Sequence, residues 1–88
     1  MASFRLEFKA SAERDIRRIS ANLVPNIIQR IESLREEPFP RQSLKLSGAE
    51  EMHRLRVGVY RVVYQVDLER HLIRVHYVRH RRDAYRDL

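Results

Sequence analysis

Apolar and polar residues alternate near the start of the chain, over residues 3–9. Phe4, Leu6 and Phe8 fall on one face of an extended segment, while Arg5 and Glu7 fall on the other. A period of two over this length predicts a half-buried β-strand.

The apolar period then changes to that of a helix, first over residues 12–23 and again over residues 27–34. Ser11 stands where the N-cap of the first helix is expected. Pro25 suits the first turn of the second helix, because that turn needs no N–H from its first residue. Pro38 ends the second helix, since the residue before a proline is pushed out of the helical region. The pattern predicts a helical hairpin.

Period two returns from Met52 onward and predicts three more strands. Residues 38–51, with Pro38, Pro40 and Gly48, are interpreted as a connection. The predicted strands cover residues 52–57, about 59–66 and 72–78, joined by turns at Val57-Gly58 and residues 67–70.

The order β-α-α-β-β-β predicts an α+β fold of two layers. We expect an antiparallel sheet whose one face is covered by the N-terminal helical hairpin, with the other face left for function. The 88 residues are expected to form a single domain, 1–88.

Charge changes this picture because it is unevenly distributed. The net charge is +6, yet residues 1–51 hold nine Lys/Arg against eight Asp/Glu. Residues 52–88 hold nine arginines against four acidic residues, a net +5, and all four histidines. A local arginine cluster favours an anionic partner such as nucleic acid, because the guanidinium fork matches phosphate oxygens.

Several functional classes are excluded by composition. The chain has no cysteine, which excludes disulfides, thiolate catalysis and cysteine zinc sites. No two histidines stand four residues apart in a predicted helix, so we expect no metal and no cofactor. Neither a signal-peptide core nor an apolar run long enough to span a membrane is present, and we expect a cytoplasmic protein without membrane contact.

Strand parity predicts where the arginines point. Arg54 and Arg56 share one face of their strand, opposite to the apolar Leu55 and Val57. A tight hairpin brings Arg61 of the next strand across from them, on the side away from the helices. Like charges opposite each other destabilise a sheet, so their concentration indicates an anionic ligand.

The segments that carry these arginines resemble a known family. Residues 44–48 (LKLSG), 53–66 (HRLRVGVYRVVYQV) and 78–85 (VRHRRDAY) are similar to the RelE branch of the RelE/ParE toxin superfamily. The resemblance covers nearly the whole chain. It implies the toxin of a type II toxin–antitoxin system, a ribosome-dependent endoribonuclease that cleaves mRNA in the ribosomal A site.

The resemblance also implies roles for individual residues. The catalytic set implied is Arg61, Arg81, Tyr85 and Arg56, in which Arg61 and Arg81 stabilise the transition state and Tyr85 stacks on a base or assists proton transfer. The RNA-binding set is Arg54, Lys45, Arg79, Arg82 and His80. The partners implied are the ribosome with its mRNA and a cognate antitoxin, whose DNA-binding part takes the complex to operator DNA.

The general base stays open at this point. Family members can carry lysine at the positions of Arg54 and Arg56, whereas arginine, which stays protonated in proteins, is a poor base. A neutral His80 is one alternative, because neighbouring arginines disfavour its protonated form. The other interpretation of His80 is that it orients the tail by a hydrogen bond.

Two other functions compete with mRNA cleavage. The ParE branch shares the fold but poisons DNA gyrase and is not a nuclease. The presence of Arg81 and Tyr85 beside Arg61 favours the nuclease branch. A basic nucleic-acid-binding module without catalysis is the third possibility.

Overall fold

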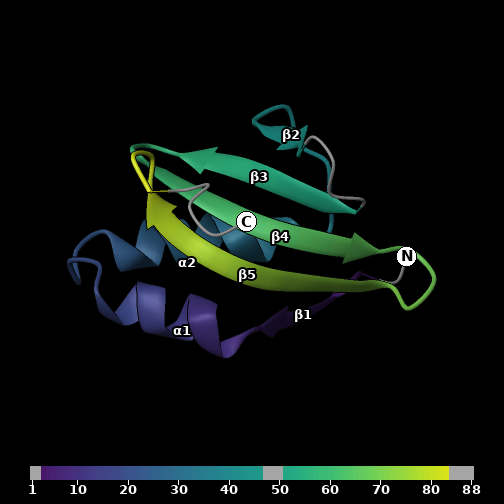
Figure 1. Ribbon diagram of the computed structural model, residues 1–88. Helices are drawn as coiled ribbons and strands as arrows, with labels where there is room; N and C mark the ends of the chain where they lie inside the picture. Colours follow the sequence, from purple (N-terminus) through teal and green to yellow (C-terminus); the bar gives the residue numbers. More distant parts are fainter. Residues whose placement is uncertain (1–2, 47–50, 84–88) are drawn as a thin grey trace.

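The computed structural model describes residues 3–46 and 51–83. Within them a five-stranded sheet in the order β1-β5-β4-β3-β2 packs against two helices (Figure 1). The elements are β1 (Arg5–Phe8), α1 (Ala10–Arg17), α2 (Val24–Ser33), β2 (Ser43–Lys45), β3 (Met52–Val57), β4 (Tyr60–Asp67) and β5 (Leu72–His80).

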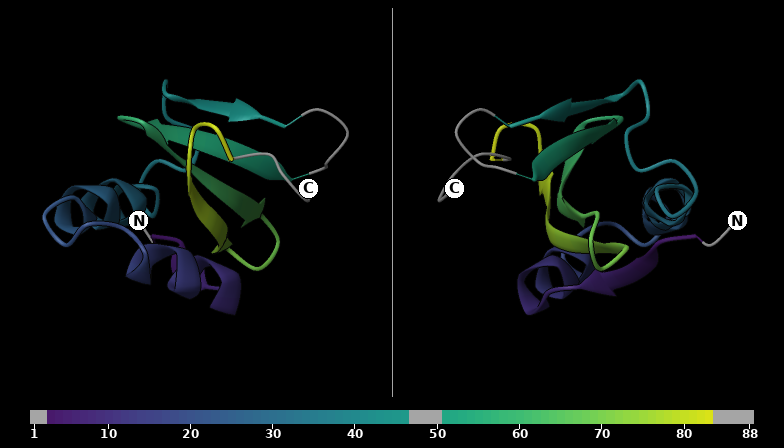
Figure 2. Two further views of the ribbon diagram at one scale, coloured as in Figure 1. Left: turned by 60° about the vertical axis from the view of Figure 1, so that its left-hand side comes forward. Right: turned by 90° about the vertical axis from the view of Figure 1, so that its right-hand side faces the viewer.

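The predicted α+β fold is confirmed, with α2 against one face of the sheet and α1 along the edge that β1 and β5 form (Figure 1). Figure 2 shows α2 nearly end-on in its right-hand view, beside one face of the twisted sheet. Strands β2 to β5 pair antiparallel with one another, as expected. The expectation of an antiparallel sheet is wrong for β1, which pairs parallel with β5, Leu6 lying opposite Ile73. Neither described helix has the length and apolar character needed to cross a membrane.

The predicted order lacks one strand, because β2 lies inside the segment interpreted as a connection. Ser43 pairs with Leu55 and Lys45 with His53, which places β2 at the free edge of β3. The Leu46 N–H donates to the Met52 carbonyl at 2.9 Å. A strand of three residues carries too little alternation to be recognised among proline and serine turn signals.

The core lies between the helices and one face of the sheet. Ile27, Ile31 and Leu34 from α2 and its C-terminal end meet the buried side chains of β3 and β4 there, Leu55 and Tyr64 among them. Tyr64 is fully buried, and its hydroxyl donates to the Pro38 carbonyl at 2.7 Å. The core face expected from strand parity is therefore the one that the helices cover.

The N-cap predicted at Ser11 is wrong, because α1 already begins at Ala10. Ser11 Oγ instead donates to the carbonyl of His76 in β5 at 2.6 Å. Asp15 Oδ2 accepts a hydrogen bond from the Val78 N–H at 3.0 Å. Since β1 pairs only with the first part of β5, α1 satisfies polar groups along the rest of that sheet edge.

A β-bulge changes the side-chain alternation in β5. Val63 pairs with Tyr77 and Tyr64 with Val75, so His76 is the extra residue between them. Two residues of one strand then oppose one of its partner, and the alternation restarts after the bulge. As a result Tyr77 and Arg79 share the open face of the sheet, while Val78 lies in the core.

Candidate nucleic-acid interface

Three arginines stand side by side across the open face of the sheet. Arg56 of β3 pairs with Arg61 of β4, which in turn pairs with Arg79 of β5. Arg54 lies one step along β3 on the same face. Like charges in directly opposed positions destabilise a sheet, so this row indicates a surface built for an anion.

Two of the predicted catalytic arginines are held at the β3–β4 turn. Arg61 Nη1 donates to the carbonyls of Gly58 at 3.1 Å and Tyr60 at 3.0 Å. Its Nε and Nη2 groups make no hydrogen bond to any residue in the described part of the chain. The backbone N–H of Arg81 donates to the Val59 carbonyl at 2.7 Å. The turn thus brings Arg61 and the start of the tail to one end of the open face.

The arginines also line a hollow of about 290 Å³. Its walls are Arg54, Arg56 and Arg61 from β3 and β4, together with Arg41, Gln42 and Leu44 from β2 and the residues before it. None of these six residues is acidic. Arg41, Arg56 and Arg61 form no ion pair within residues 3–46 and 51–83. The hollow therefore concentrates positive charge, and its lining residues supply no negative charge.

Residues 6–85 match the family of the ParE toxin of type II toxin–antitoxin systems, parDE. The chain belongs to this family of toxins. At the level of whole chains it is 25% identical over 87 residues to RelE1, a candidate toxin of Methanocaldococcus jannaschii, covering 96% of this chain and 97% of that protein.

Solved structures place the toxin in the RelE fold. RelE in the RelE–RelB complex of Pyrococcus horikoshii superimposes with a TM-score of 0.79 at 23% identity, covering 90% of this chain and 96% of the other. The isolated RelE toxin of E. coli gives 0.77 at 22% identity, covering 89% and 84%. At these identities the likeness is one of fold, and it agrees with the RelE-like architecture expected from the sequence.

In the toxin, the Arg79 side chain contacts Asp15 and Tyr77. Arg79 Nε lies 3.6 Å from Asp15 Oδ2, and the guanidinium carbon lies 3.9 Å from the ring centre of Tyr77. The two ion-paired side chains are only 21% and 15% exposed. This contact holds α1 against the end of β5, so Arg79 stands on the open face as a partly buried, neutralised cation.

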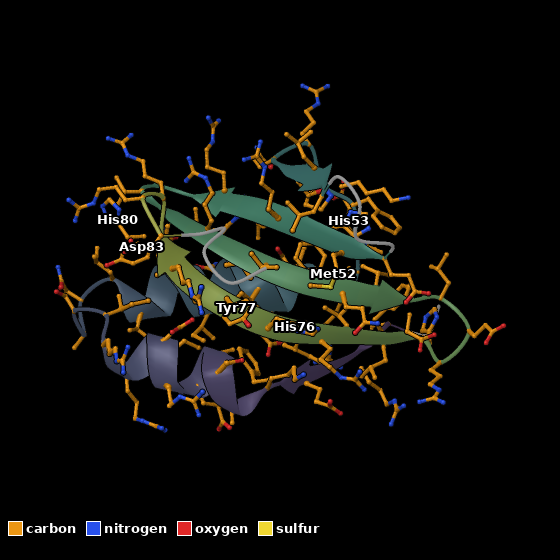
Figure 3. The ribbon with its side chains drawn as sticks, in the orientation of Figure 1. Met52, His53, His76, Tyr77, His80 and Asp83 are labelled. Carbon is orange, nitrogen blue, oxygen red and sulfur yellow. The ribbon has the colours of Figure 1, made fainter. Side chains whose placement is uncertain are left out.

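Tyr77 was not singled out by sequence reasoning. It lies in the middle of β5 on the face turned to the viewer in Figure 3 and is partly exposed there. The bulge at His76 decides this orientation. Because a bulge depends on how two strands pair, no local signal in the sequence could have identified Tyr77.

Two predicted RNA-binding residues lie away from the hollow. Lys45 pairs with His53, so it shares the face opposite to that of Arg54. His80 pairs with Tyr60 and contacts its ring edge, at the end of β5 seen in Figure 3. His80 lines a second hollow, of about 360 Å³, with Asp15 and other residues at that end of the fold. The structure does not bring either residue to the arginine row.

Of the two remaining predicted tail residues, Arg82 lies within the described part of the chain and Tyr85 does not. The backbone N–H of Arg82 donates to His80 Nδ1 at 3.2 Å, and the Arg82 side chain is exposed beyond β5. This bond matches the orienting role considered for His80. Tyr85 lies outside the described residues, so its predicted role stays a prediction.

Two histidines make the toxin's stability depend on pH. Burial, and then the charge of Lys45, lowers the pKa of His53 from 6.5. Burial, followed by the charges of Lys9 and Arg74, lowers the pKa of His76 from 6.5. The unfolded chain therefore binds more protons than the folded one as the pH falls through 6.5, and the folded state loses stability.

We expect the melting temperature to fall on acidification from about pH 7.5 to about pH 5.5. Thermal melts followed by circular dichroism measure it. A His53→Gln/His76→Gln double variant should melt with a shallower dependence on pH over the same interval. Equal slopes for the variant and the natural chain would show that these two histidines do not cause the effect.

Proposed function

We propose that this toxin is a ribosome-dependent endoribonuclease that cleaves mRNA in the ribosomal A site. The observation that carries the proposal is the pairing of Arg56 with Arg61 on the open face, with the Arg81 backbone bound to the same turn. Such a site can hold the charge of a phosphate during its displacement. The names of the RelE relatives support the same choice of branch.

The proposed reaction is an internal transesterification of RNA. The 2′-oxygen attacks the adjacent phosphorus, the bond from phosphorus to the 5′-oxygen breaks, and the products are a 2′,3′-cyclic phosphate and a 5′-hydroxyl. Arg61 and Arg81 stabilise the charge that accumulates on the phosphorane. Arg81 is also the candidate to share a proton with the departing 5′-oxygen. In this scheme guanidinium groups supply the positive charge, and no metal ion is assigned a role.

The other residues of the site hold the RNA. Arg54 and Arg56 bind phosphate oxygens along β3, and Tyr85 is retained as the residue that stacks on an unpaired base. The residue that removes the 2′-proton is left unassigned, because no lysine, histidine or carboxylate lines the described hollow. The ribosome or its RNA can complete the site, which accounts for a requirement for ribosomes.

We also propose that a cognate antitoxin controls this activity. The P. horikoshii and E. coli relatives were solved as RelE–RelB or RelBE complexes. For this chain, an antitoxin with an acidic or amphipathic segment suits the basic C-terminal part. A DNA-binding part of that antitoxin would take the complex to its operator.

The decisive test is the mode of growth arrest after expression without antitoxin. We expect protein synthesis to stop and mRNA to be cut within codons, as mapped by primer extension on translating ribosomes. Gyrase poisoning is the competing function, since the matched family carries the ParE name. Continued protein synthesis with accumulating DNA breaks would establish it instead. RNA binding without any cut would indicate a non-catalytic module.

A further inference from the structure

The hollow of about 290 Å³ extends beyond the arginines that the proposed reaction uses. Its far wall is built by Arg41, Gln42 and Leu44, which no catalytic or binding role yet includes. In the sequence these residues lie in the segment interpreted as a connection. The pairing of β2 with β3 brings them beside Arg54 and Arg56.

The far wall is fixed in place by its own hydrogen bonds. The carbonyl of Gln42 accepts from the Arg56 N–H at 3.2 Å, and its side-chain oxygen accepts from Arg30 Nη2 at 3.4 Å. Ser43 donates to the Pro40 carbonyl through its N–H at 2.9 Å and its hydroxyl at 2.8 Å. Gln42 is thus held against β3 and Pro40 against Ser43, which fixes the backbone on both sides of Arg41. Arg41 is exposed and lines the hollow.

The lining combines charge with an apolar surface. Leu44 lies on the same open face of the sheet as Arg54, and its side chain is 55% exposed there. An exposed leucine among four arginines is poorly suited to a bare inorganic anion, which gains nothing from an apolar contact. It suits a group that carries a phosphate and a flat apolar face together, as a nucleotide does.

The size of the hollow agrees with that chemistry. A volume of about 290 Å³ lies just below the range for small-ligand pockets, roughly 300–1,000 Å³. One water molecule occupies about 30 Å³ in the liquid, so a single phosphate group would leave most of the hollow to solvent. One nucleotide fills it more completely.

We propose that this hollow binds the nucleotide next to the cleaved bond, with Arg41 contacting its phosphate and Leu44 its base. The inference rests on the proposed function, because it assumes that the arginine row works on RNA. Arg41 is then a binding residue that sets the register of the strand on the toxin. Arg61 and Arg81 keep their roles at the reacting phosphate.

The test uses the full chain and adenosine 3′,5′-bisphosphate as the probe, followed by the backbone amide NMR signals of the toxin. We expect the probe to shift signals in β2 and β3 and to bind about tenfold more weakly to Arg41→Ala, the size of one lost charged contact. Leu44→Ala should weaken the bisphosphate but leave the affinity for inorganic phosphate unchanged. Arg70→Ala is the matched control, since Arg70 is an exposed arginine at the opposite, β4–β5 turn.

The outcomes separate this inference from the function on which it rests. If Arg41→Ala binds the probe as Arg70→Ala does while the toxin cleaves mRNA, the inference is wrong and the proposed function stands. If the toxin fails to cleave mRNA but Arg41→Ala and Leu44→Ala bind the bisphosphate more weakly as expected, the nucleotide site stands and the proposed reaction is wrong. If a hexaglutamate peptide occupies the hollow and Leu44→Ala changes nothing, the surface binds acidic protein segments and the inference is overturned.

Discussion

Replacement of Arg61 or Arg81 by alanine is expected to lower the rate of mRNA cleavage roughly 10²–10³-fold, the effect of losing one well-placed charged donor. The geometry gives the reason. Arg61 Nη1 is bound to two turn carbonyls, which fixes the guanidinium with its Nε and Nη2 side available. Arg81 follows β5 directly, and its backbone bond to Val59 holds it at the same turn. The backbones of both residues are thus anchored at one turn, and the proposed function has their guanidinium groups converge on one phosphate.

The measurement is single-turnover cleavage on programmed ribosomes at saturating toxin, with affinity determined separately. Arg54→Ala and Arg56→Ala should instead weaken binding and reduce its salt dependence, because each removes a phosphate contact. Arg70→Ala should cleave as the natural chain does. If Arg61→Ala and Arg81→Ala cut at the normal rate once saturated, these arginines bind RNA and do not stabilise the transition state.

Substitution of Leu55 by alanine is expected to lower the free energy of unfolding by about 2–5 kcal/mol. Leu55 is fully buried in the core face of β3, between the two arginines of the open face. Its removal leaves a cavity in the cluster that includes Val62, its partner in β4. Domains of this kind are stable by about 5–15 kcal/mol, so the loss is a large fraction of the total.

Leu44 offers a matched control on the neighbouring strand. It is 55% exposed, and Leu44→Ala should change the free energy of unfolding by no more than about 0.5 kcal/mol. Urea unfolding of both variants, followed by circular dichroism, gives the comparison. Equal destabilisation by the two substitutions would contradict the assignment of β3 faces, on which the position of the arginine row also depends.

Local patterns were sufficient for most of the fold. Alternation predicted the strand Met52–Val57 with its observed bounds, and it placed Arg54 and Arg56 opposite the buried Leu55. Helical spacing and Pro25 located α2. These features depend on neighbours within a few residues, because side-chain direction in a strand or helix follows from the backbone period alone. The open, basic face was predictable for the same reason.

Pairing between distant segments decided the rest. β2 forms because Ser43–Lys45 pairs with the edge of β3. That pairing places Leu44 on the side of the hollow and Lys45 on the opposite side. The bulge at His76 turns Tyr77 and Arg79 to the open face and leaves His80 beside Tyr60. Ser11 and Asp15 bond to β5 rather than to their own helix, since the short β1 leaves polar groups of β5 unpaired. The register of two strands and the hydrogen bonding of a sheet edge each depend on two segments together. The sequence of either segment alone could therefore not determine them.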